Sequence, residues 1–142
     1  MESPKTRKPI RDLVRPHLVD MPGYGFAQAP KAKVEQWTAL VKDYLRGRPT
    51  LARVLLLIDA RHGLKAVDLA VMGLMDQAAV SYQIVMTKID KIKPGELARI
   101  MAATAAELKS HAAAHPALLA TSARAGAGMA ELRAQIAQVG LA

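Results

Sequence analysis

Short apolar runs alternate with longer amphipathic segments along this chain, and that alternation constrains the fold more than any other feature of the sequence. Arg53–Ile58 and Gln83–Met86 are short and mainly apolar, which is typical of buried strands. Ala66–Ala78 reads as a helix between them, and Pro94 begins another helix that runs to about His111. Such alternation predicts an α/β fold, in which a mostly parallel sheet is flanked by helices.

The same pattern extends toward both ends of the chain. We expect a short strand at Leu18–Asp20, an amphipathic helix over Lys31–Arg46, a strand over Ala117–Ala120 and a last helix over Met129–Val139. The strand over Arg53–Ile58 is expected to be covered on both faces. Residues 1–17 are predicted to form a basic, irregular arm, and residues 18–142 a single domain.

Composition narrows the classes of function. The 142 residues carry a net charge of +8 and no cysteine, so we expect neither disulfides nor a cysteine-based metal site. No apolar run approaches the roughly 18 residues of a membrane helix, and we predict a cytoplasmic protein without a membrane partner. The positive charge suits an RNA or ribosome partner, although a merely basic surface explains it equally well. His17, His111 and His115 lack metal-ligand spacing and are predicted to lie at the surface.

A ten-residue string that begins at Leu18 contains the first motif that points to chemistry. It reads Leu-Val-Asp-Met-Pro-Gly-Tyr-Gly-Phe-Ala. In P-loop GTPases, the Asp of an Asp-x-x-Gly element holds the magnesium shell, and the Gly N–H faces the γ-phosphate. Here those positions are Asp20 and Gly23, with Pro22 before the glycine. A strand that ends in Asp before a Pro-Gly turn would give the same letters without that function.

Two further motifs follow predicted strands. Thr87-Lys88-Ile89-Asp90 is similar to the guanine-specificity element Asn-Lys-x-Asp. A carboxylate at Asp90 can accept two parallel hydrogen bonds from guanine, which adenine cannot offer, and the stem of Lys88 can lie over the base. A solvated Lys-Asp turn is the alternative. Thr121-Ser122-Ala123 is similar to the Ser-Ala element whose backbone N–H groups approach guanine O6.

These motifs, in this order, resemble the EngB family of bacterial ribosome-assembly GTPases. Asp59-Ala60-Arg61-His62 is also similar to an element of that family, with a partner-binding or a structural role. The resemblance covers residues 18–142, about the C-terminal two-thirds of an EngB-type G domain. It implies a P-loop GTPase-like (TRAFAC) fold and a role in large-subunit assembly and in cell division and septation. The implied partners are the large ribosomal subunit and its rRNA, not DNA.

The resemblance also assigns the ligands and their residues. GTP or GDP with Mg²⁺ is the implied ligand, and Asp20 is expected to reach the metal through water. The implied nucleotide-binding residues are Asp20, Pro22, Gly23, Thr87, Lys88, Asp90, Thr121, Ser122 and Ala123. Tyr24 stands where Ras-like enzymes carry the Gln that orients the attacking water, so hydrolysis is expected to be slow or to use another group.

One required motif is missing. The phosphate-binding string Gly-x-x-x-x-Gly-Lys-Ser/Thr occurs nowhere in the sequence, and Gly63-Leu64-Lys65 has the wrong spacing. We therefore expect an N-terminally truncated domain that lacks its first strand and P-loop, with impaired nucleotide binding and hydrolysis. In the complete fold that strand would lie between the strand that ends at Asp20 and the strand that ends at Asp59.

Three functions stay open at this point. The chain is a GTP-binding ribosome-assembly factor, or a non-enzymatic remnant that keeps base recognition without the phosphate site. Alternatively it is an unrelated α/β enzyme that uses Asp20 and Asp59, at adjacent strand ends, as metal ligands. The ordered series of motifs argues against the third.

Overall fold

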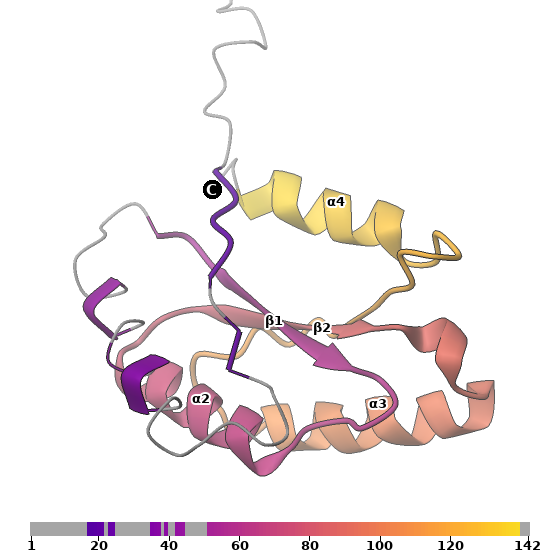
Figure 1. Cartoon of the computed structure of the whole chain (residues 1–142), viewed down its shortest axis with the longest axis horizontal. Helices are drawn as coiled ribbons and strands as arrows, with labels where there is room; N and C mark the ends of the chain where they lie inside the picture. Colours follow the sequence, from indigo (N-terminus) through magenta and orange to yellow (C-terminus); the bar gives the residue numbers. More distant parts are fainter. Residues whose placement is uncertain are drawn as a thin grey trace, which may run out of the picture.

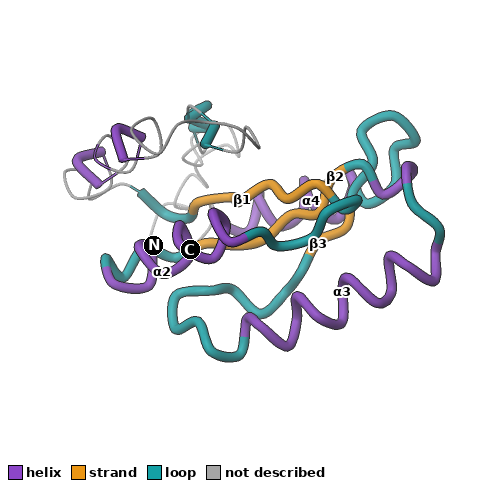
Figure 2. Tube along the Cα trace, turned by 60° about the horizontal axis from the view of Figure 1, so that its bottom comes forward, coloured by secondary structure: helices purple, strands orange, loops and turns teal. Residues whose placement is uncertain are grey.

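The fold is a three-stranded parallel sheet with helices on both faces, as the computed structural model of the chain shows (Figure 1). The structure describes residues 17–21, 23–24, 35–37, 39, 42–44 and 51–139. Its elements, in chain order, are β1 (Val54–Asp59), α2 (Ala66–Gln77), β2 (Tyr82–Thr87), the 3-10 turn η2 (Ile89–Lys91), α3 (Pro94–Leu108), β3 (Leu119–Ala120) and α4 (Met129–Val139). The sheet order is β1-β2-β3, which places β1 on the outside (Figure 2).

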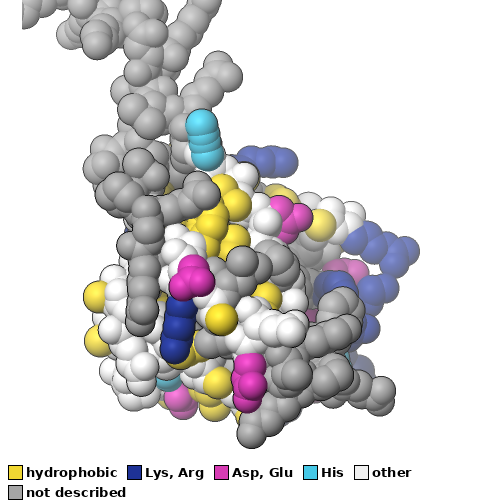
Figure 3. Space-filling view, turned by 60° about the vertical axis from the view of Figure 1, so that its left-hand side comes forward, with side chains coloured by type: hydrophobic (Ala, Val, Ile, Leu, Met, Phe, Trp, Pro, Cys, Tyr) yellow, Lys and Arg dark blue, Asp and Glu magenta, His cyan; other side chains and the backbone are white. Residues whose placement is uncertain are grey.

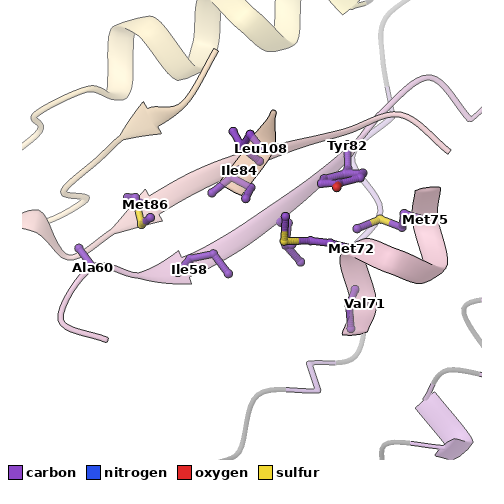
Figure 4. Close-up of a cluster of buried hydrophobic side chains, with 10 residues drawn as sticks. Ile58, Ala60, Val71, Met72, Met75, Tyr82, Ile84, Met86 and Leu108 are labelled. Atoms are coloured by element: carbon purple, nitrogen blue, oxygen red, sulfur yellow. The ribbon is translucent and has the colours of Figure 1, made fainter. Parts of the chain in front are cut away.

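One face of the sheet forms the core with α2 and α3. Ile58 of β1, Ile84 and Met86 of β2 and Met72 of α2 point toward one another on this face (Figure 4). Leu56, Ala60, Val71, Met75, Tyr82 and Leu108 complete the buried cluster. Burying a side chain of this size stabilises the fold by about 1.5–3 kcal/mol. The predicted strands over Arg53–Ile58 and Gln83–Met86 and the predicted helices that begin at Ala66 and Pro94 are therefore confirmed, because their apolar residues meet in a common core.

The second face of the sheet is covered less completely. α4 lies over it (Figure 1), but none of the residues of α4 is buried. Leu57 of β1 points away from the core and leaves 62% of its surface exposed. The prediction that this strand is covered on both faces was therefore wrong for β1. It fits β2, in which Tyr82 through Met86 are all buried.

The N-terminal elements differ from the expectation. No strand forms at Leu18–Asp20, and Leu18 and Val19 are 74% and 54% exposed. The predicted strand was wrong, because an apolar run becomes a strand only when a neighbour pairs with it, and no described strand does. Within the predicted helix Lys31–Arg46, residues 35–37, 39 and 42–44 are helical and the others lie outside the described residues. The predicted arm, residues 1–17, also lies outside them apart from His17.

His111 is mostly buried, contrary to its predicted surface position. Its Nδ1 lies 2.6 Å from Asp76 of α2, and its Nε2 lies 3.0 Å from Glu107 of α3. Asp76 also accepts hydrogen bonds from the Ala113 N–H and the Tyr82 hydroxyl. Burial opposes charging the imidazole, but the two carboxylates outweigh burial and raise the pKa of His111. The cluster joins α2, α3 and the start of β2.

In the part of the chain that the structure describes, no helix combines the length and apolar character that a membrane crossing requires.

Candidate functional site

Two of the predicted motifs, Thr87–Asp90 and Thr121–Ala123, meet at the carboxyl ends of β2 and β3, beside Asp59 at the end of β1. Parallel pairing sets Asp59 beside Thr87 and Met86 beside Ala120, so the residues that follow these strands share one edge of the sheet. Backbone hydrogen bonds extend this contact. The Thr121 N–H donates to the Met86 carbonyl at 2.8 Å, and the Ile89 N–H donates to the Thr121 carbonyl at 3.2 Å. Two motifs separated by more than thirty residues in sequence thus lie against each other.

Ser122 connects these two motifs. Its side chain is fully buried, and its hydroxyl donates a 2.8 Å hydrogen bond to Oδ1 of Asp90. The same hydroxyl oxygen accepts a hydrogen bond from the Ala125 N–H. The hydrogen bond from the Ser122 hydroxyl lowers the pKa of the Asp90 carboxyl, which stays exposed to solvent. The result is an oriented carboxylate with free acceptor positions at the end of β2.

Lys88 lies beside this carboxylate in an unusual backbone conformation. Its φ of 58° and ψ of 37° place it in the left-handed region, which non-glycine residues adopt at a cost and often at functional sites. Its ammonium is 3.7 Å from Asp59 at the end of β1. Asp59 is also held by Arg61, whose Nη2 lies 2.7 Å from Oδ2. These hydrogen bonds from Arg61 hold the pKa of Asp59 well below its usual range.

The loop after Ser122 is held tightly against β3 by Gly128. A Cβ on Gly128 would clash with the carbonyl oxygen of Ala120, and the φ of this glycine is +70°. Both observations require glycine at this position. Gly126 N–H donates to the Ser122 carbonyl at 2.8 Å, which closes the turn. The sequence placed Gly128 before the last helix but gave no sign of this close approach.

The segment around the first motif lies on the β1 side, where Asp20 and Gly23 line the same cavity as Asp59. Asp20 and Gly23 are exposed, and Pro22 lies outside the described residues. Tyr24 turns inward, and its hydroxyl donates a 2.7 Å hydrogen bond to Asp68 of α2. Burial, together with this carboxylate, raises the pKa of the Tyr24 phenol, which stays neutral. Asp68 also accepts from the Lys65 N–H at the start of α2, a role that sequence reasoning missed.

Known proteins match this chain over most of its length. A protein of Bradyrhizobium diazoefficiens named "Probable GTP-binding protein EngB" is 60% identical over 122 residues, which cover 86% of this chain and 56% of the relative. A Rhodopseudomonas palustris protein of the same name is 61% identical over 117 residues, covering 82% of this chain and 54% of the relative. One from Chelativorans sp. is 59% identical over 125 residues, covering 88% and 56%. No family model matches the chain.

The matched segment is about 60% identical to these EngB proteins. The resemblance inferred from the motifs is thereby confirmed. The chain spans about half the length of the curated relatives it matches. The activity and partners of whole EngB proteins therefore do not transfer to it directly.

Solved structures confirm the fold of the matched segment. Translation elongation factor SelB from Methanococcus maripaludis, in its apo form, superimposes with a TM-score of 0.64 at 22% identity, covering 80% of this chain and 24% of SelB. The same factor in complex with the GTP analogue GppNHp gives a TM-score of 0.59 at 23% identity, covering 72% and 23%. The α/β, GTPase-like fold predicted from the sequence is therefore correct.

The described residues do not by themselves form a magnesium site. Asp20 offers one exposed carboxylate, and no group of three His, Cys, Asp or Glu side chains in the described ranges is arranged to hold a metal ion. Asp59, the other ligand of the metalloenzyme alternative, is already bound by Arg61 and Lys88. Mg²⁺ commonly keeps several waters and takes one or two carboxylates together with phosphate oxygens. A water-mediated role of Asp20 beside a nucleotide stays a prediction.

Proposed function

We propose that the cluster formed by Thr87–Asp90 and Thr121–Ala123 binds the guanine base of GTP or GDP. Asp90 accepts hydrogen bonds from guanine N1–H and its exocyclic amine, and the stem of Lys88 lies along the base. The backbone N–H group of Ala123 faces guanine O6, whereas the Ser122 N–H already donates to the Ala127 carbonyl at 2.9 Å. The observation that carries the proposal is the hydrogen bond from the buried Ser122 hydroxyl to Asp90, because it presents an oriented, charged carboxylate to solvent at the strand ends.

The phosphate side of the proposed site is incomplete in this chain. Asp20, Pro22 and Gly23 belong to it, with Asp20 reaching Mg²⁺ through water. The sequence contains no Gly-x-x-x-x-Gly-Lys-Ser/Thr string to hold the α- and β-phosphates. We therefore expect weak nucleotide binding and no GTP hydrolysis by this chain alone. This missing string favours the alternative function, a guanine-binding module without enzyme activity.

The biological role proposed here is that of EngB-type proteins, namely assembly of the large ribosomal subunit in the cytoplasm, with effects on cell division and septation. The identity of about 60% between the matched segment and these proteins supports it. The net charge of +8 supports an rRNA partner, because basic side chains neutralise phosphates. DNA and membranes are not proposed as partners.

Competition against a fluorescent GDP analogue tests the base site. Unlabelled GDP should displace the analogue at least about tenfold more effectively than ADP, because ADP leaves the carboxylate without its two donors. Asp90→Asn should abolish this preference and favour xanthosine diphosphate, whose C2 carbonyl accepts from the Asn amide. Glu96→Gln, an exposed carboxylate on α3, should behave like the wild type. Equal displacement by GDP and ADP would refute the proposal.

A further inference from the structure

The carboxylate of Asp59 is the centre of a charge cluster beside the proposed guanine site. Asp59 ends β1 and pairs in register with Thr87, the first residue of the guanine motif. Its Oδ2 lies 2.7 Å from Nη2 of Arg61 and 3.7 Å from the ammonium of Lys88. The side chain of Asp59 is 23% exposed, against 44% for Arg61 and 58% for Lys88. The carboxylate is therefore more enclosed than either cation that it holds.

Arg61 fixes the orientation of this carboxylate. Its Nε lies 3.0 Å from Oδ1 and 3.2 Å from Oδ2 of Asp59, and its backbone N–H donates to Oδ1 at 3.0 Å. Together with the contact from Nη2, these bonds form a fork, which restrains a carboxylate more than a single contact does. Asp59 therefore presents Oδ2 to Lys88 from a fixed position.

The surroundings of Asp59 on the β1 side are mainly apolar. Asp59 lines part of a cavity of about 550 Å³ whose walls include Leu18, Val19 and Leu57. Figure 3 shows hydrophobic side chains gathered at the surface on this side of the molecule. Apolar walls lower the local dielectric constant and so strengthen the attraction between opposite charges. The ion pair between Asp59 and Lys88 should therefore be stronger than a pair surrounded by water.

The backbone around Lys88 is held on both sides, whereas its side chain is not. The Ala60 N–H donates to the Thr87 carbonyl at 2.9 Å, and the Ile89 N–H donates to the Thr121 carbonyl at 3.2 Å. Both sequence neighbours of Lys88 are thus fixed, and its left-handed backbone is fixed with them. A lysine side chain has a flexible stem, and ordering that stem against a ligand costs conformational entropy. A residue that restrains the stem beforehand reduces this cost.

The fold places Lys88 between two carboxylates, Asp59 at the end of β1 and Asp90 two residues further along the chain. Among the described residues, the ammonium of Lys88 forms its ion pair with Asp59 and not with Asp90. Recognition of guanine requires the oxygens of Asp90 to accept from the base, and an ammonium bound there would compete for the same acceptors. Asp59 thus keeps Lys88 and Asp90 apart.

We propose that Asp59 is a positioning residue for guanine recognition, because it holds the Lys88 ammonium so that the stem lies along the base and Asp90 stays free to accept from it. Arg61 acts through Asp59, whose carboxylate it orients. This gives the Asp59-Ala60-Arg61-His62 element a role within the nucleotide site. The inference rests on the proposed function, since it assigns a task within the same guanine site.

Asp59→Asn tests the inference, because it removes the charge and keeps an acceptor for the Arg61 N–H. In competition with a fluorescent GDP analogue, we expect this variant to bind GDP about two- to fivefold more weakly than the wild type, the range of a partly exposed charge pair. Its preference for GDP over ADP should also fall. Glu96→Gln, which removes the carboxylate of an exposed pair with Arg99, should bind like the wild type.

A double-mutant cycle separates positioning from a merely structural role. Lys88→Met keeps an unbranched stem and removes the ammonium. In this background Asp59→Asn should change GDP binding by less than about 1.5-fold, because the carboxylate has no ammonium left to hold. An effect of Asp59→Asn as large as in the wild type would mean that Asp59 acts on the fold of the loop, and would overturn the inference.

A nucleotide-free measurement keeps the test independent of GDP binding and of the folding of Asp59→Asn. The NMR signal of the Asp59 carboxyl carbon should shift in Lys88→Met. It should stay in place in Lys91→Met, which removes an exposed ammonium from the same turn. An unshifted Asp59 signal in Lys88→Met, or wild-type GDP binding by Asp59→Asn, would overturn the inference and leave the proposed function intact. Equal binding of GDP and ADP by the wild type would instead refute the proposed function, and the inference with it.

Discussion

β2 and β1 are adjacent strands of similar apolar composition, yet their surroundings differ. β2 is paired on both sides and buried from Tyr82 to Met86, and the loop after it is joined to the loop after β3 through Ser122 and Asp90. β1 is paired on one side and leaves Leu57 exposed. The loops after β2 and β3 are therefore joined by residues of this chain, whereas no described strand pairs with the outer edge of β1.

Gly128→Ala should cause the largest effect, because it places a Cβ against the Ala120 carbonyl at the end of β3. We expect a loss of about 2–4 kcal/mol in the free energy of unfolding, from overpacking together with a left-handed backbone. Gly126→Ala is the matched control. Its φ is also positive, at +78°, but its Cβ would meet nothing within 4 Å. Urea unfolding should show a much smaller loss for Gly126→Ala, and equal losses would contradict the close approach.

Ser122→Ala removes the hydroxyl that joins the two motifs. Since this hydroxyl is buried and bonds both Asp90 and the Ala125 N–H, we expect a loss of about 1–3 kcal/mol in stability and a reduced preference for GDP over ADP. Thr104→Val removes another buried hydroxyl, which donates to the Ile100 carbonyl on α3, outside the two loops. It should lower stability and leave the nucleotide preference unchanged. Equal effects of both variants on nucleotide preference would mean that the Ser122 hydroxyl has no specific role in guanine binding.

The His111 cluster should make stability depend on pH. Because the pKa of His111 is raised in the folded state, its stabilising contribution is full below the unfolded value of 6.5 and is lost as pH rises through the folded pKa. Compared with His111→Gln, the wild type should therefore lose free energy of unfolding as the pH rises above 6.5. His17→Gln, at an exposed histidine, should follow the wild type. Parallel pH profiles of His111→Gln and the wild type would refute a charged His111.

Arg61→Gln should have the smallest effect on stability, because its ion pair with Asp59 is exposed. Its effect on titration should still be clear. The pKa of Asp59 is low because Arg61 holds the carboxylate, so NMR titration should show it rising toward its ordinary value in the variant. Arg99→Gln, which breaks the exposed pair with Glu96, is the control and should leave Asp59 unchanged. An unshifted Asp59 in Arg61→Gln would mean that the pair does not persist in solution.

The helices and the inner strands were predictable because their own residues carry the signal. Apolar spacing located α2, α3 and α4 to within a few residues, and β2 is apolar because both of its faces are covered. Both motifs were predicted to follow strands, and because the strand ends of a parallel sheet share one edge, the structure brings Asp90 and Ser122 together. Their roles toward a nucleotide stay proposals.

The structural predictions failed where the conformation or burial of a residue depends on residues far away in the sequence. Leu18–Asp20 has the composition of a strand but no described partner, and Leu57 belongs to an apolar run whose second face is open. The position of His111 depends on Asp76, which lies 35 positions earlier on α2 and contacts the His111 ring. The close approach of Gly128 to Ala120 likewise follows from loop geometry, which the residues themselves do not encode locally.

Parallel NMR titrations of the full chain with GDP and with ADP would test the proposed guanine site, since backbone amide signals report on both loops and on β1 at once. We expect GDP to shift the signals of Thr87–Asp90 and Thr121–Ala125, and ADP at the same concentration to leave them in place. The signals of Leu55 and Leu57 should respond to neither nucleotide. Equal shifts with both nucleotides, or GDP shifts confined to residues outside these two loops, would contradict a guanine site at the ends of β2 and β3.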